Sequence, residues 1–152
     1  MSDAWQKLIN EVPAVFESLT KSEPLQNPVS VEHRGKKGIY IFKDGDKIVH
    51  VGRTRNLQQR IRSHRTANHN SASLAFKLTR RQTGRYATYK PEGSRKDLLN
   101  DADFYGKFVE NIEAIKKMDV FFVEVESHEM QYLVELYACL KYQLSTDEFD
   151  TT

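Results

Sequence analysis

Two short apolar runs joined by an Asp-Gly turn constrain the fold of this chain more than any other feature. Residues 38–42 and 48–52 have the composition of β-strands, and Asp44–Asp46 carries the turn signal of a hairpin. We expect the two runs to pair antiparallel, with Asp44–Asp46 as a three-residue loop. Counted outward from this loop, the register places Tyr40 directly opposite His50, with both residues on one face of the sheet.

Side-chain alternation assigns the other residues of the hairpin to the opposite face, which we expect to be apolar. That face consists of Ile39, Ile41, Val49 and Val51. Gly38 and Gly52 allow another group to approach the strands closely, so the face with Tyr40 and His50 has the geometry of a site. A strand tyrosine is also commonly structural, and His50 can be a half-exposed strand residue, so that alternative stays open.

A short helix is expected directly after the hairpin, because residues 54–56 read as a capping segment and residues 57–65 as helical. Its apolar stripe has i, i+3, i+4, i+7 spacing and consists of Leu57, Arg60, Ile61 and His64. Two polar groups therefore approach the sheet, which is costly unless they serve a groove or site. Alternatively, Arg60 extends its charge to water and His64 is a hydrogen-bonded residue at the helix end.

Charge is segregated along the chain, although the net charge is only +2. Residues 33–96 hold 17 Lys and Arg against 3 Asp and Glu, a net charge of +14, while the rest holds 6 basic and 18 acidic residues. A basic surface around one site favours a polyanion, since Lys and Arg displace counterions from phosphates. A solvated face balanced by the acidic residues is the alternative. The candidate phosphate contacts are Arg53, Arg55, Arg62, Arg65, Lys77, Arg80, Arg81 and Arg85.

The segment between residues 66 and 96 mixes these basic residues with Tyr86 and Tyr89. Tyrosines can stack on unpaired bases, so branched, nicked or single-stranded substrates fit this composition, and no sequence specificity follows from it. Residues 97–118 carry a helical apolar pattern that we interpret as a packing insertion. The pattern consists of Leu98, Leu99, Phe104, Phe108, Ile112 and Ile115.

The N-terminal residues predict a helix in which Pro13 must begin, kink or divide the element, and residues 29–33 alternate like a short strand. With 39% apolar residues, a single domain over residues 1–152 is expected. It comprises a helical N-terminal extension over residues 1–28 and a basic and helical insertion over residues 66–119. No apolar run approaches the roughly 18 residues that span a bilayer, and no signal pattern is present, so we expect a cytoplasmic protein without membrane contact.

The C-terminal residues predict a strand and then a helix. Residues 120–125 suit the central strand of the sheet, and Ser127 can cap the helix that follows. The expected core residues of this helix are Met130, Leu133, Leu140 and Leu144. Glu135 lies opposite this stripe, either on a site-facing surface or on a solvated face. Cys139 is read as a packing residue, because a lone cysteine cannot form an internal bridge.

These segments together resemble the GIY-YIG endonuclease family. Its first tripeptide is intact at residues 38–40, whereas its second, usually Tyr-Ile-Gly or Tyr-Val-Gly, reads His-Val-Gly at residues 50–52. Leu57, Arg60 four residues before His64, and a downstream helical glutamate also match, so that the resemblance spans residues 38–65 and 120–149. It implies an α/β (α+β) fold in which a small three-stranded antiparallel sheet is flanked by helices.

The resemblance also implies hydrolysis of DNA phosphodiester bonds by a water molecule. Tyr40 would orient or deprotonate this water, with a phenol pKa lowered by Arg60 and a metal, and His50 would share the task. Arg60 would pair with the scissile phosphate, and His64 would donate a hydrogen bond to a phosphoryl oxygen or assist proton transfer. Glu135 would be the metal ligand, for Mg²⁺ or Mn²⁺.

Two departures from the family pattern leave an alternative function open. His50 replaces the second motif tyrosine, and Asp147 stands where many relatives carry an asparagine. A catalytically disabled module that binds nucleic acid without cleaving it is therefore the alternative to an active enzyme. RNA in place of DNA, a protein partner and a homodimer also stay open.

Overall fold

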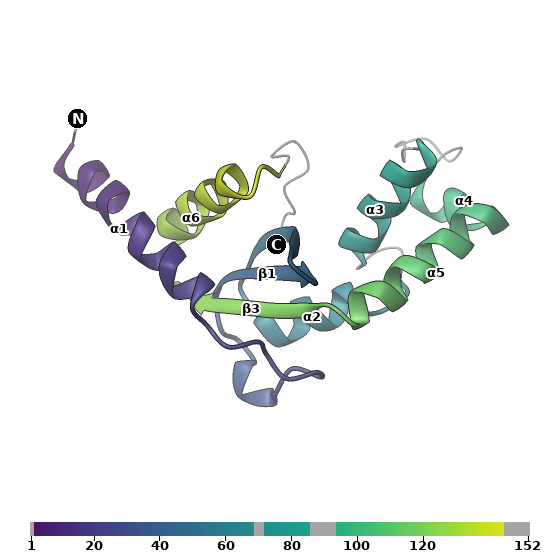
Figure 1. Ribbon diagram of the computed structural model, residues 1–152, viewed down its shortest axis with the longest axis horizontal. Coiled ribbons are helices and arrows are strands. Elements are labelled where there is room, and N and C mark those ends of the chain that lie inside the picture. Colours follow the sequence, from purple (N-terminus) through teal and green to yellow (C-terminus); the bar gives the residue numbers. More distant parts are fainter. Residues whose placement is uncertain (1, 69–71, 86–93, 145–152) are drawn as a thin grey trace. The chain divides into compact units, whose positions relative to one another are not determined.

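The computed structural model describes residues 2–68, 72–85 and 94–144 (Figure 1). The chain divides into two compact units, each described here by itself. The sheet unit consists of Met1–Arg60 and Met118–Thr152, and the helical unit consists of Ile61–Lys117. Among the described residues, none of the helices combines the length and the apolar character needed to cross a membrane.

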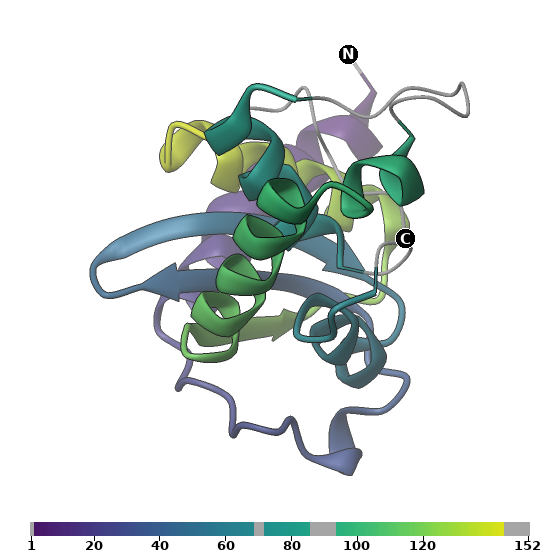
Figure 2. The same ribbon diagram turned by 90° about the vertical axis from the view of Figure 1, so that its right-hand side faces the viewer.

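Within the described residues, one antiparallel sheet has the strand order β2-β1-β3. The strands are β1 (Gly38–Asp44), β2 (Lys47–Thr54) and β3 (Asp119–Glu124), and Figure 2 shows them running side by side. The predicted α+β fold with a small antiparallel sheet is confirmed. The central strand is β1 and not the predicted segment 120–125, because β1 pairs with a neighbour on each side. Gly38 permits this arrangement, since a Cβ there would overlap the carbonyl oxygen of Val123.

The hairpin turn is tighter than the sequence predicted. Asp44 pairs with Lys47, so the turn contains two residues instead of three. Gly45 occupies it with a φ of 60°, a left-handed conformation that glycine adopts without a steric penalty.

A bulge displaces the register of the hairpin by one residue. Phe42 pairs with His50 while the next residue of β1 pairs with Ile48, so Val49 has no cross-strand partner. The tighter turn and the bulge together pair Tyr40 with Gly52, and the predicted direct pairing of Tyr40 with His50 is wrong. The two residues still lie on one face, as predicted, because His50 is two residues from Gly52 along the strand.

Helices α1 (Asp3–Thr20) and α6 (His128–Lys141) lie side by side and cover the other face of the sheet (Figure 1). The core between them contains Ile39, Ile41 and Val51, as predicted, with Ile48 packed against it in place of Val49. Pro13 lies inside α1 and neither begins nor divides this helix.

The buried side of α6 differs in part from the predicted one. Met130 is buried and Leu133 and Leu144 pack against the core, as expected, but Leu140 is 66% exposed. The buried residues of the helix also include Val134, Ala138 and Cys139. The predicted packing role of Cys139 is therefore confirmed. Ser127 caps the helix as predicted, since its side-chain oxygen accepts a hydrogen bond from the backbone N–H of Met130 at 3.2 Å.

The predicted strand at residues 29–33 is absent from this described segment. A 3-10 turn, η1 (Val31–His33), stands in its place, and the hydroxyl of Ser30 accepts a hydrogen bond from the backbone N–H of Glu32 at 3.4 Å. A serine at the start of a turn satisfies a backbone donor locally and thereby competes with strand pairing.

Helix α2 (Leu57–His64) follows β2 directly, as predicted. The helical unit then contains α3 (Ser73–Thr83), α4 (Arg95–Leu99) and α5 (Ala102–Lys116). The ring of Phe76 packs on Phe104 and Phe108, with centroids 5.3 and 6.1 Å apart, and Asn111 donates a hydrogen bond to Thr79 at 2.9 Å. The predicted apolar pattern of residues 97–118 forms the core of this unit, whereas helix α3 was not predicted.

Candidate active site

Tyr40, His50 and Arg60 meet on the face of the sheet opposite α1 and α6. The hydroxyl oxygen of Tyr40 lies 3.5 Å from Nε2 of His50, and Nε of Arg60 donates a hydrogen bond to the same oxygen at 3.2 Å. Tyr40 is completely buried and His50 is 3% exposed. The central strand supplies Tyr40, β2 supplies His50 and α2 supplies Arg60, so three consecutive elements hold the cluster.

Gly52 provides the space in which the tyrosine ring lies. A Cβ at this position would overlap the ring and the hydroxyl group of Tyr40, its cross-strand partner. The glycine of the second tripeptide is therefore a steric requirement of the tyrosine of the first. The close approach of Tyr40 to Gly52 thus couples the first tripeptide on β1 to the second on β2.

The ring of Phe42 gives the polar cluster an apolar neighbour. Its ring lies 6.0 Å from that of Tyr40 in an edge-to-face arrangement and 6.3 Å from that of His50. Hydrogen bonds in such a poorly solvated environment are electrostatically stronger than in water. The arrangement can thus hold the Tyr40 oxygen between a permanent positive charge and an imidazole.

His64 is also completely buried, at the end of α2. It follows Arg60 by four residues, so the two side chains lie on one face of the helix. Leu57 and Ile61 of the predicted stripe are buried as well.

Glu135 is fully buried and forms an ion pair with Arg53 of β2. Its Oε1 lies 3.3 Å from Nε of Arg53, and the ring centroid of Tyr132 lies 4.2 Å from the guanidinium carbon of Arg53. Arg53 pairs with Ile39, which places it on the face that α6 covers. The solvated alternative for Glu135 is therefore excluded.

The ligand chemistry of Glu135 fits a divalent cation of the Mg²⁺ type. Such ions take carboxylate oxygens, keep several water molecules and are held by one or two carboxylates together with substrate phosphates. In residues 2–68, 72–85 and 94–144, no group of three His, Cys, Asp or Glu side chains gathers as a further metal centre. Arg53 is a cationic partner of Glu135 in this structure.

The candidate phosphate contacts differ widely in their surroundings. Arg55, Arg62 and Arg81 are exposed, whereas Lys77 is only 8% exposed. Burial lowers the pKa of Arg65 from its usual value.

Two further basic candidates of the helical unit have aromatic or acidic partners. The guanidinium of Arg80 lies 5.6 Å from the ring centroid of Phe76, and Arg85 forms an ion pair with Asp101 at 2.9 Å. Tyr86, Tyr89 and Asp147 lie outside the described residues.

Sequence reasoning missed the partnership of Arg53 and Glu135. Strand alternation offered the signal on the β2 side, because Arg53 is two residues from Val51, which was placed in the core. On the α6 side, large apolar residues lie on several faces of the helix, so the sequence pattern does not show that Glu135 is buried.

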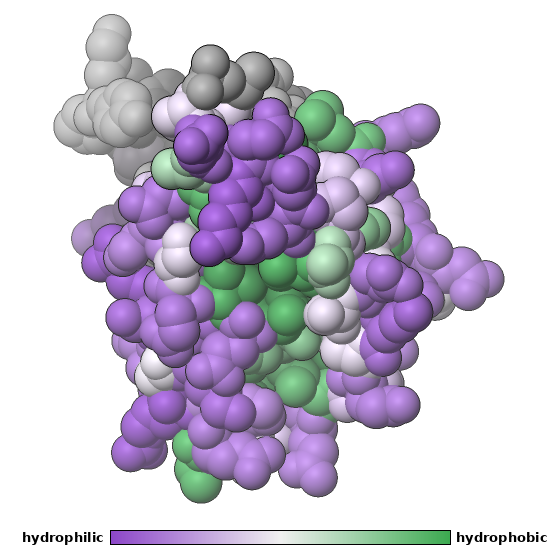
Figure 3. Space-filling view, turned by 90° about the vertical axis from the view of Figure 1, so that its left-hand side faces the viewer, coloured by the Kyte–Doolittle hydropathy of each residue, from purple (hydrophilic) through white to green (hydrophobic). Residues whose placement is uncertain are grey.

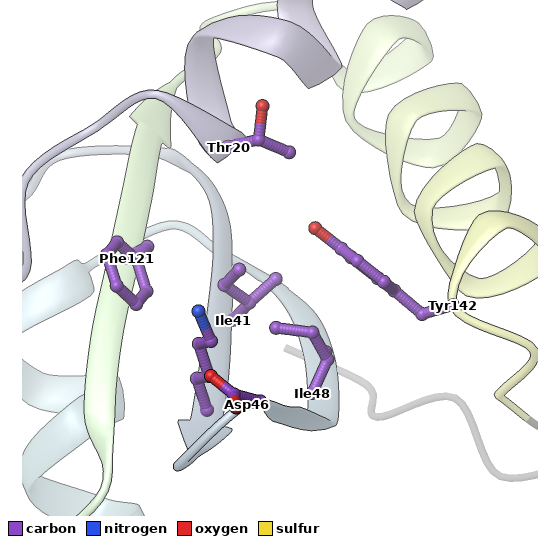
Figure 4. A pocket seen from close by; sticks show the side chains of 7 residues that line it. Thr20, Ile41, Asp46, Ile48, Phe121 and Tyr142 are labelled. Atoms are coloured by element: carbon purple, nitrogen blue, oxygen red, sulfur yellow. The ribbon is translucent and has the colours of Figure 1, made fainter.

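A shallow pocket of about 250 Å³ opens on the α1 and α6 face of the sheet. It is lined by Thr20, Ile41, Lys43, Asp46, Ile48, Phe121 and Tyr142, most of which Figure 4 labels. Figure 3 shows apolar side chains gathered in the middle of the side on which α1 lies, with hydrophilic ones around them. Ile41 and Tyr40 point to opposite faces, so this pocket is separate from the Tyr40 cluster.

The class that these observations define is a small α+β domain: its antiparallel sheet has a central strand that begins with Gly-Ile-Tyr, and a helical arginine contacts the tyrosine oxygen. Residues 36–99 match the sequence model of the GIY-YIG catalytic domain, which confirms the resemblance predicted from the sequence. None of the curated proteins and none of the solved structures compared with the chain matches it.

The matched segment differs in extent from the predicted resemblance. It contains Tyr40, His50, Arg60 and His64 and continues to residue 99, beyond the predicted limit at residue 65. It does not include Glu135. The match relates residues 36–99 to the catalytic domain of GIY-YIG nucleases.

Proposed function

We propose that this chain is a metal-dependent endonuclease that hydrolyses phosphodiester bonds in DNA. The observation that carries this proposal is the contact of both Arg60 and His50 with the hydroxyl oxygen of Tyr40. A neighbouring guanidinium favours a phenolate over a phenol, and an imidazole can accept or return a proton near neutral pH. These are the groups that orient and deprotonate an attacking water.

Arg60 and His64 are proposed to act on the phosphate. A guanidinium carries five N–H donors in a planar fork, so Arg60 can bond to Tyr40 and to a phosphoryl oxygen together. His64 lies on the same helical face and can donate a hydrogen bond to a second oxygen. Charge that develops on these oxygens during hydrolysis is thereby stabilised.

Glu135 is proposed to hold the divalent cation, Mg²⁺ or Mn²⁺. When bound, the cation supplies Lewis-acid stabilisation of the leaving oxygen. Exposed basic residues such as Arg55, Arg62 and Arg81 are proposed to contact the DNA backbone without reading its sequence.

A nucleic-acid-binding module without cleavage activity is the second candidate. The observation that favours it is the complete burial of Tyr40 and Glu135, together with the Arg53 guanidinium on the Glu135 carboxylate. In this arrangement neither group is open to water. An active enzyme must therefore expose both groups when substrate and cation bind.

Cleavage of supercoiled plasmid and of labelled branched DNA distinguishes the two candidates. The purified chain is incubated with Mg²⁺, Mn²⁺ or EDTA and compared with Glu135→Gln and Tyr40→Phe. The matched control is Glu110→Gln, which neutralises an exposed carboxylate in α5. An enzyme nicks both substrates only with a cation and loses this activity in the two site variants, while the control stays active. Binding of both DNAs without nicking under every condition would support the module instead.

A further inference from the structure

Arg53 and Glu135 form a closed arrangement on the α6 side of the sheet. The carboxylate is completely buried, and the arginine side chain is only 13% exposed. Tyr132 covers the guanidinium with its ring at 4.2 Å and is itself half exposed. An aromatic side chain thus covers the guanidinium of this buried ion pair.

The two ends of this arrangement belong to different elements of the sheet unit. Arg53 lies directly after Gly52 on β2, so its backbone is fixed by pairing with β1. Tyr132 and Glu135 are three residues apart on α6, and side chains with this spacing lie on the same side of a helix. The helix therefore presents both the carboxylate and the ring that covers its partner.

A guanidinium and a divalent cation cannot occupy one carboxylate independently. Both need the same oxygens, and two positive charges at contact distance repel strongly where water is scarce. A cation that approaches Glu135 must displace Arg53 or bind against its charge. The stacked ring opposes displacement, because cation–π contacts strengthen when the cation is desolvated.

We propose that Arg53 is a positioning residue that limits the uptake of a divalent cation by Glu135, and that Tyr132 sets this limit by holding the guanidinium in place. The proposal rests on the metal-binding role proposed above for Glu135. Cation binding then requires a released state of Arg53, and the apparent affinity is reduced by the fraction of molecules in that state.

Binding of Mn²⁺ to the purified chain without nucleic acid tests the proposal. It is followed by electron paramagnetic resonance of the free ion and by calorimetry. Arg53→Met keeps much of the side-chain length without the charge and should tighten Mn²⁺ binding by about tenfold, if the released state makes up roughly a tenth of wild-type molecules. Tyr132→Leu should tighten it by a smaller factor.

Matched controls separate this effect from a general change of charge or surface. Lys47→Met removes an exposed positive charge elsewhere on β2, and Leu136→Ala shortens an exposed residue of α6. Both should bind Mn²⁺ as the wild type does. Adding Glu135→Gln to Arg53→Met should abolish the gained affinity.

Unchanged or weaker Mn²⁺ binding in Arg53→Met would overturn the proposal, as would a gain that survives the loss of Glu135. Thermal melting checks the fold of each variant. If Arg53→Met does not fold, Tyr132→Leu decides, because it retains the ion pair: tighter binding supports the proposal and equal binding overturns it.

Failure of the proposal is distinguishable from failure of the proposed nuclease function. If Arg53→Met binds Mn²⁺ more tightly but neither it nor the wild type nicks DNA, the limiting role of Arg53 is supported and the proposed nuclease function is overturned. Nicking that depends on Glu135, with equal Mn²⁺ affinity in the wild type, Arg53→Met and Tyr132→Leu, supports the nuclease function and overturns the limiting role of Arg53.

Discussion

The hydroxyl oxygen of Tyr40 lies 3.5 Å from Nε2 of His50, although these residues do not face each other across the hairpin. Tyr40 pairs with Gly52, and its ring extends over the glycine. The diagonal contact brings a histidine into the position from which it can exchange a proton with the phenol. The chemistry of the cluster therefore depends on a glycine as much as on its polar residues.

Tyr40→Phe should separate chemistry from folding. It removes one buried hydroxyl group that contacts Arg60 and His50, so we expect a stability change of about 1 kcal/mol and a cleavage rate lower by about 10²–10⁴-fold. Plasmid nicking and urea denaturation measure the two effects. Tyr105→Phe, at an exposed tyrosine of α5, is the control and should match the wild type in both. Equal nicking by Tyr40→Phe would contradict the proposed role.

Gly52→Ala should destabilise the sheet unit by about 1–3 kcal/mol, because the added methyl group overlaps the Tyr40 ring. Gly106→Ala provides a control of opposite sign. A Cβ at this position of α5 meets no atom within 4 Å, so the substitution should stabilise the helix by up to about 1 kcal/mol. Urea denaturation measures both. A stable Gly52→Ala variant would show that the tyrosine ring can move aside.

The hairpin illustrates how far the sequence alone leads. The apolar runs and the Asp-Gly signal predict two paired strands, and alternation places Tyr40 and His50 on one face. The bulge at Val49 is not predictable from these residues. It brings Ile48 into the core in place of Val49, and the two side chains are similarly hydrophobic. Only the packing of the complete sheet decides between the two registers.

The surroundings of Glu135 were less predictable than those of Tyr40. Helix α6 carries large apolar residues on several sides, so its pattern does not define a single buried stripe. The sequence favoured a stripe through Leu140, which is exposed, whereas the structure buries Glu135 next to Val134. A buried carboxylate becomes tolerable only with its cationic partner, and that partner comes from a strand 82 positions earlier in the chain.

Two truncations in α6 test this reassignment of its buried face. Val134→Ala should cost about 2 kcal/mol, since it opens a cavity in the core between helix and sheet. Leu140→Ala should change stability by no more than about 0.5 kcal/mol, because its side chain is largely in water. Urea denaturation compares the variants. A larger loss of stability in Leu140→Ala than in Val134→Ala would support the buried stripe predicted from the sequence.

Stability of the helical unit should depend on pH through Asp101. The pKa of this carboxyl group is held below its usual range, first by a hydrogen bond from the backbone N–H of Phe104 and then by Arg85. A folded pKa below the unfolded value of about 3.9 gives a stabilisation that is fully present above that pH. It is lost as the pH falls through the folded pKa.

Asp101→Asn checks this linkage, because it neutralises the charge while keeping a side-chain oxygen for the cap. We expect a lower melting temperature than in the wild type at pH 7 and a difference that shrinks as the pH falls below about 4. Arg85→Met should lose part of the same stabilisation. A difference between Asp101→Asn and wild type that stays constant over the acidic range would show that the charge does not contribute.

Variants of His50 test whether this residue is a proton acceptor or a spacer. His50→Gln retains hydrogen-bonding capacity but cannot accept a proton, so we expect cleavage to fall by about 10²-fold with nucleic-acid binding unchanged. His50→Tyr restores the tripeptide usual in GIY-YIG enzymes and should retain more activity than the glutamine variant. Nicking assays and binding by fluorescence anisotropy measure the two properties. Full activity of His50→Gln would instead assign His50 to packing between the rings of Tyr40 and Phe42, which it contacts in this structure.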